Sequence, residues 1–101
     1  MALKRALSPT HPGEILREDV LPALGIGVME AAGKLGVSRQ TLHRIVATTN
    51  PRPVTPDMAV RLGKLCGNGP RLWLNLQSAY DLWHAERRID TRGIPTLHAA
   101  E

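Results

Sequence analysis

Five side chains that can form hydrogen bonds lie close together near the middle of the chain: Arg39, Gln40, Thr41, His43 and Arg44. Guanidinium and carboxamide groups pair specifically with DNA bases, because each can form two parallel hydrogen bonds with one base edge. Arg39 is therefore predicted to contact guanine O6 and N7, and Gln40 to contact adenine N6 and N7. Arg44, about one helical turn later, is the third predicted base contact.

Other side chains around this stretch are predicted to contact phosphates, which position a protein on DNA without reading its sequence. They are Lys34, Ser38, Thr41 and Arg52. Each predicted contact has a simpler alternative, a solvated surface side chain. The charge distribution favours a polyanionic partner, since residues 34–71 hold seven Lys and Arg and one acid in a chain of formal net charge +4.

Two short helices joined by a tight turn would present these side chains outward. Apolar side chains in residues 28–35 recur at i, i+3, i+4 and i+7, the period of an amphipathic helix. Gly36 then allows the left-handed turn. Ser38 is predicted to cap the second helix, which turns Leu42 and Ile45 inward. This is the helix-turn-helix pattern, whose second helix enters the major groove of DNA. A structural helix pair that never contacts DNA is the alternative.

Length and composition predict one small domain without an enzyme's cleft. The chain has 101 residues, no Phe, two Trp and one Tyr, so its core is expected to consist mostly of aliphatic side chains. No apolar run approaches the roughly 20 residues that cross a bilayer, and the first residues lack the pattern of a signal peptide. The single cysteine, Cys66, excludes an intramolecular disulfide and suits a reducing cytoplasm.

Residues that could hold a metal or perform catalysis are scattered. The histidines show no metal-ligand spacing: His11, His43, His84 and His98. Cys66 occupies an apolar helical position and is predicted to be a core residue. Ser38 has no recognisable base to activate it. Neither a metal, a cofactor nor an enzymatic activity is therefore expected.

The remaining pattern is also helical, so the predicted fold class is all-α with five helices. Pro12 is expected to open the first helix with His11 as its cap, and Pro22 to end or bend it. Thr55 is predicted to cap the fourth helix, and the fifth spans residues 71–86. The predicted divisions are a basic lead-in at residues 1–10, a helix-turn-helix domain with a C-terminal dimerisation helix at residues 11–86, and a tail at residues 87–101.

The last helix is apolar over more of its circumference than one core needs. The stripe predicted to close the core consists of Leu72, Leu76, Ala79 and Trp83. Leu74 and Leu82 lie off this stripe. Because paired DNA half-sites are bound by two-fold dimers, Leu74, Leu82 and Trp83 are predicted to form a homodimer interface. The alternative is that they are isolated exposed apolar residues, which are common on protein surfaces.

Several motifs occur in order along residues 10–85 with the spacing of a known family. They are His11-Pro12-Gly13-Glu14-Ile15-Leu16, Val37-Ser38-Arg39-Gln40-Thr41-Leu42, Val54-Thr55-Pro56-Asp57-Met58-Ala59-Val60-Arg61-Leu62, Trp73-Leu74-Asn75-Leu76-Gln77 and Tyr80-Asp81-Leu82-Trp83. As a set, they resemble the HigA-type antitoxins of the lambda-repressor-like (XRE) helix-turn-helix family. The resemblance implies a dimeric five-helix regulator that binds double-stranded operator DNA and a HigB-like mRNA-cleaving toxin, and represses the operon encoding both.

One feature of the sequence is consistent with such a toxin partner. Glu14, Glu18 and Asp19 place acids on the first helix, and a protein that cleaves RNA must itself be basic to hold phosphates. These three residues are predicted to bind the toxin. Two other functions stay open: a stand-alone helix-turn-helix regulator without a toxin, and a protein-interaction module that does not bind DNA.

Overall fold

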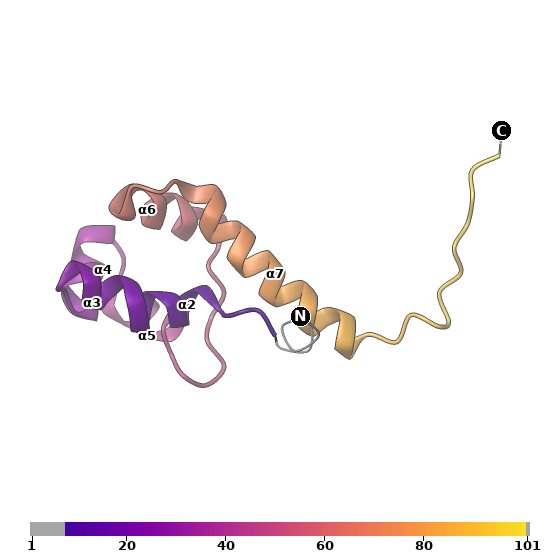
Figure 1. Ribbon diagram of the computed structural model, residues 1–101, viewed down its shortest axis with the longest axis horizontal. Helices are drawn as coiled ribbons and strands as arrows, with labels where there is room; N and C mark the ends of the chain where they lie inside the picture. Colours follow the sequence, from indigo (N-terminus) through magenta and orange to yellow (C-terminus); the bar gives the residue numbers. More distant parts are fainter. Residues whose placement is uncertain (1–7, 101) are drawn as a thin grey trace.

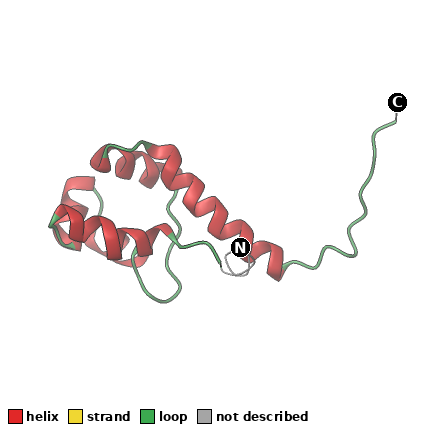
Figure 2. Cartoon of the chain, viewed as in Figure 1, coloured by secondary structure: helices red, strands yellow, loops and turns green. Residues whose placement is uncertain are grey.

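The structure, a computed structural model, describes residues 8–100, and all regular secondary structure in that range is helical (Figures 1 and 2). The elements in chain order are α2 (Pro12–Ile15), η1 (Leu16–Val20), α3 (Leu21–Leu24), α4 (Val28–Leu35), α5 (Arg39–Ile45), α6 (Pro56–Cys66) and α7 (Pro70–Arg88). Since α2, η1 and α3 are continuous, the described range contains five helical segments, and the predicted all-α fold is confirmed. Most of the predicted lead-in, residues 1–7, lies outside the described residues.

The first helical segment begins as predicted but does not end at its proline. His11 is the cap, and its Nδ1 accepts a hydrogen bond from the Gly13 amide at 2.9 Å. Pro22 is predicted to end or bend the first helix. It does not end the helix, because helical structure continues to Leu24. The π-helical turn η1 precedes Pro22, and the Leu21 amide bonds to the Leu16 carbonyl. This wider turn accommodates a proline ring that would clash in a regular α-helix.

The His11 cap makes stability depend on pH. Burial lowers the pKa of the His11 ring below its ordinary value, against the opposing effects of the Asp81 and Glu14 carboxylates and the Arg52 backbone. The unfolded chain therefore binds a proton more readily than the folded one, and stability is expected to fall as the pH drops below about 6.5. Urea unfolding from pH 8 to pH 5 measures this. A His11→Asn variant keeps a capping acceptor, so its stability should fall less over the same range.

The core lies where α4, α5 and α6 meet the first helical segment and the first half of α7. Its buried apolar side chains are Leu16, Leu21, Ala31, Ala32, Leu35, Leu42, Ile45, Val46, Val54, Met58, Ala59, Leu62 and Trp73. The α6 and α7 helices pack side by side, and the second half of α7 projects beyond the other helices (Figure 1). Residues 89–100 continue as a non-helical tail.

The α7 helix faces the core with a different side from the predicted one. Trp73 and Gln77 are buried, whereas Leu72 is 45% exposed and Ala79 is also exposed. Gln77 can lie inside because its Oε1 accepts a hydrogen bond from the Val54 amide at 2.7 Å and its Nε2 donates one to an Asp81 carboxylate oxygen at 2.9 Å. The predicted stripe is therefore wrong for Leu72 and Ala79, while Leu76 is half-buried against the core and Trp83 is half-buried. Because its amide is paired on both sides, Gln77 is acceptable inside.

Candidate nucleic-acid interface

The α5 helix lies on the surface with its apolar side inward and its polar side exposed. Leu42 and Ile45 are buried, which anchors the helix against the core. Gly36 adopts the left-handed conformation, with φ of 74°, and ends α4. Ser38 Oγ accepts a hydrogen bond from the Thr41 amide at 3.0 Å, which confirms the predicted cap. The helix, the turn and the second helix are thus formed as the sequence predicts.

The three predicted base-contacting side chains share the exposed side of α5. Arg39 and Gln40 occupy the first turn of the helix, directly after the Ser38 cap, and Arg44 lies in the last turn. None of the three takes part in an ion pair with another described residue. Their guanidinium and amide groups are therefore available to a partner. The base contacts themselves stay predictions.

The predicted phosphate-contacting side chains surround α5. Ser38 and Thr41 lie on the exposed cap, with their hydroxyl oxygens 2.8 Å apart. Lys34 is exposed in the last turn of α4, where its Nζ lies 3.8 Å from a Glu30 carboxylate oxygen. The Arg52 amide bonds to the Arg44 carbonyl at 2.9 Å, so the loop folds back on the end of α5. The structure thus gathers basic side chains and hydroxyl groups around one helix.

One hollow lies between α5 and the loop that precedes α6. It has a volume of about 210 Å³, and Thr41, Arg44 and Arg52 are among the residues that line it. Arg44 and Arg52 therefore flank the same depression. This arrangement is suited to a phosphate group as well as to a base edge, since arginine pairs with both.

Two arginines, for which the sequence pattern predicts no role, hold the helix-turn-helix in place. Arg61 Nη1 on α6 donates a hydrogen bond to the Leu35 carbonyl at 2.7 Å, at the C-terminus of α4. Arg17 Nη1 donates to the Val46 carbonyl at 2.6 Å, at the C-terminus of α5. Each cation lies at the negative end of a helix dipole. No pattern in the sequence marks these pairs, because the partners are 26 and 29 residues apart.

The acids predicted to bind a toxin lie on the first helical segment. Glu14, Glu18 and Asp19 are all exposed. A Glu18 carboxylate oxygen lies 3.4 Å from Arg17 Nε, so part of its charge is matched within the chain. Glu14 takes part in no ion pair with another described residue. The three acids share one segment with Arg17, the residue that holds the end of α5.

No cluster of three or more His, Cys, Asp or Glu side chains in residues 8–100 has the arrangement of a metal site. In the same range, no helix combines the length and the apolar character needed to cross a membrane.

Cys66 is half-buried, and burial raises the pKa of its thiol, which favours the protonated form that reacts slowly.

The fold and the exposed α5 helix define the class of this protein, a helix-turn-helix regulator. No family model matches the chain. The chain is 35% identical over 80 residues to antitoxin HigA-1 from Vibrio cholerae, and the match covers 79% of this chain and 73% of the relative. The chain belongs to the HigA-type antitoxin family of helix-turn-helix regulators.

Solved structures extend the likeness to the tertiary fold. The antitoxin HigA from Pseudomonas aeruginosa, solved with the higBA promoter, is 38% identical with a TM-score of 0.76, and the match covers 88% of this chain and 99% of that one. The antitoxin GraA, solved in complex with its operator, is 36% identical with a TM-score of 0.80, covering 92% and 95%. Both of those relatives were solved with DNA.

Proposed function

We propose that this protein is a cytoplasmic antitoxin that binds the operator of its own operon and neutralises a HigB-like, mRNA-cleaving toxin. The observation that carries the proposal is the exposed side of α5, where Arg39, Gln40 and Arg44 are available to DNA bases beside a basic surround. The solved relatives bound to a promoter and to an operator support the DNA-binding part. The toxin partner is supported by the antitoxin names of the relatives and by the exposed acids on the first helical segment.

The two parts of this proposal have separate tests. DNA binding is tested by titrating the protein into a duplex from its own promoter and into a random duplex of equal length, with preferential binding to the promoter expected. The toxin part is tested by expressing the small basic protein encoded beside this gene, with and without this chain. Growth arrest that this chain relieves supports the antitoxin. Promoter binding without any toxic neighbour would instead favour a stand-alone regulator.

The functional unit is proposed to be a homodimer held by α7. Leu82 is 60% exposed on the half of α7 that projects from the other helices, and Leu72 is also exposed. Trp83 is half-buried, and Leu74 is half-buried against the core of its own chain. Leu82 is therefore the strongest candidate among the predicted interface residues, and Leu74 has less surface left to offer. A helix face with this much apolar surface is typical of an interface.

A Leu82→Glu variant is expected to dimerise at least about tenfold more weakly, because it puts an unpaired charge into an apolar interface. Sedimentation across micromolar concentrations measures the change. Val60→Glu is the matched control, since Val60 is also 60% exposed but lies on α6. Equal dimerisation of wild type and both variants would remove Leu82 from the interface, and a wild-type protein that sediments as a monomer would exclude the homodimer.

A further inference from the structure

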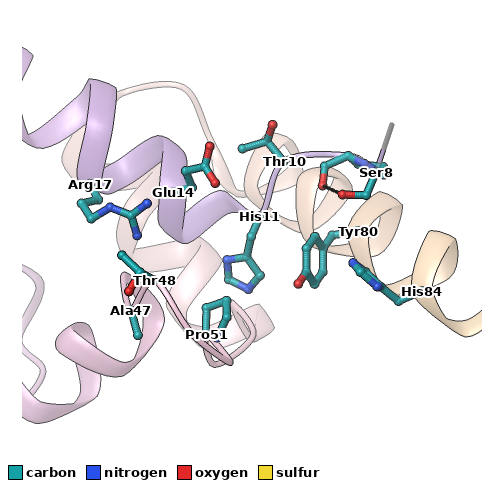
Figure 3. A pocket seen from close by; sticks show the side chains of 11 residues that line it. Ser8, Thr10, His11, Glu14, Arg17, Ala47, Thr48, Pro51, Tyr80 and His84 are labelled. Carbon is teal, nitrogen blue, oxygen red and sulfur yellow. Dashed lines mark hydrogen bonds between the residues drawn. The ribbon is translucent and has the colours of Figure 1, made fainter. Parts of the chain in front are cut away.

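A second hollow lies beside the first helical segment and the loop that follows α5. It has a volume of about 440 Å³ and is lined by the segment before α2, by the loop after α5 and by α7 (Figure 3). Glu14, Arg17, Thr48, Tyr80 and His84 are among its lining residues. The exposed acid Glu14 therefore forms part of its wall, and Glu18 lies beside the lining residue Arg17, with 3.4 Å between a Glu18 carboxylate oxygen and Arg17 Nε.

The His11 ring supplies an unused hydrogen-bond donor to this hollow. His11 is only 5% exposed and lines the hollow, with its ring between Pro51 and Tyr80 (Figure 3). Its Nδ1 accepts the hydrogen bond from Gly13, so in the neutral ring Nε2 carries the proton. Nε2 is buried and forms no well-aligned hydrogen bond with a described residue, although the Arg52 main chain lies close enough to act on the ring. A buried donor without a partner is unfavourable, so this atom is suited to a carbonyl oxygen supplied from outside.

Aromatic rings form one wall of the hollow. The His11 and Tyr80 centroids are 4.8 Å apart, nearly perpendicular, and the Tyr80 and His84 centroids are 4.3 Å apart. Of these rings, tyrosine is the type whose face attracts cations. The chain already uses this contact nearby, where the Arg87 guanidinium carbon lies 3.7 Å from the centroid of the Trp83 ring.

The charges around the hollow favour a basic ligand over an acidic one. Glu14 is exposed and makes no ion pair with a described residue, and Asp81 also acts on the His11 ring. The lining also holds two histidines, His11 and His84, and one arginine, Arg17. Arg17 Nη1 is bonded to the Val46 carbonyl, and its Nε lies 3.4 Å from a Glu18 carboxylate oxygen. The Arg17 guanidinium is thus already bonded within the chain, whereas the Glu14 carboxylate is available to a basic group of a partner.

We propose that this hollow receives a basic segment of the toxin partner, with a lysine or arginine side chain beside Glu14 and the Tyr80 ring. A main-chain carbonyl of the same segment accepts the hydrogen bond from His11 Nε2. The proposal rests on the proposed function, since a protein that cleaves mRNA needs basic side chains to hold phosphates. Toxin contact then centres on Glu14 and the neighbouring α7 surface, and not on the three acids alone.

The test measures binding of the small basic protein encoded beside this gene by calorimetry, using full-length variants of this chain. Tyr80→Leu keeps apolar bulk but removes the ring and is expected to weaken binding about tenfold or more. Glu14→Gln removes one exposed charge and is expected to weaken binding severalfold and to reduce its salt dependence. Glu30→Gln makes the same charge change on α4 and should bind as the wild type does. Promoter binding and unfolding midpoints of all variants serve as controls of folding.

Each outcome decides one statement. Weaker toxin binding by Tyr80→Leu and Glu14→Gln, with promoter binding retained, supports the hollow as the toxin-binding site. Toxin binding equal to wild type in both variants overturns the proposal that the toxin binds in this hollow, and leaves the proposed antitoxin function in place. If the basic protein does not bind even the wild type, both the toxin-binding site and the toxin part of the proposed function are overturned. If Tyr80→Leu unfolds, His84→Gln takes its place, because His84 is the other lining residue on α7 and is not one of the three acids.

Discussion

Replacing Arg39 by alanine is expected to abolish most discrimination between promoter and random DNA. Arg39 is exposed in the first turn of α5, where the side chain is available to a base edge. A bidentate base contact contributes about 1–3 kcal/mol of discrimination, and a dimer would lose two such contacts, or about 2–6 kcal/mol. Titration of promoter and random duplexes over a series of salt concentrations measures the difference.

Arg52→Ala is the control for this experiment. A phosphate contact adds affinity for any sequence, so its loss should weaken binding to both duplexes alike and reduce the salt slope by about one unit per contact. Arg52 also flanks the 210 Å³ hollow with Arg44, which is consistent with a phosphate there. If Arg39→Ala weakens binding to both duplexes equally, Arg39 contacts phosphate and does not read a base.

A Gly13→Ala variant is expected to lose about 3 kcal/mol or more of stability, because overpacking a closed contact forces the backbone apart. Gly13 is buried, and a Cβ atom at this position would overlap the main-chain carbonyl of Ile45 at the end of α5. The first helical segment and α5 would have to separate. Urea unfolding monitored by circular dichroism measures the loss.

Gly33→Ala is the matched control for Gly13→Ala. Gly33 lies within α4, and a Cβ there meets no atom within 4 Å. Alanine should therefore stabilise the protein by up to about 1 kcal/mol through its better helix propensity. Equal stability of the Gly13→Ala variant and the wild type would show that the close approach of α2 to Ile45 does not constrain the fold.

The sequence by itself determined the features that depend on neighbouring residues. The caps at His11, Ser38 and Thr55 and the left-handed turn at Gly36 were all predicted and are all present. Each is a hydrogen bond or a backbone conformation within a few residues, so residue type and spacing are enough to predict it. The exposed side of α5 follows from the same local pattern, because its apolar residues can face only one way.

Tertiary structure alone decided which side of α7 faces the core and how the helices are tied together. Gln77 is buried because the Val54 amide, 23 residues away, pairs with it. Arg17 and Arg61 find carbonyl partners at helix ends that are distant in sequence, and the His11 hollow forms only where α2, the loop after α5 and α7 meet. Such pairings compensate the burial of polar groups. Hydrophobic periodicity cannot predict them, because it records which residues are apolar and not where a distant partner lies.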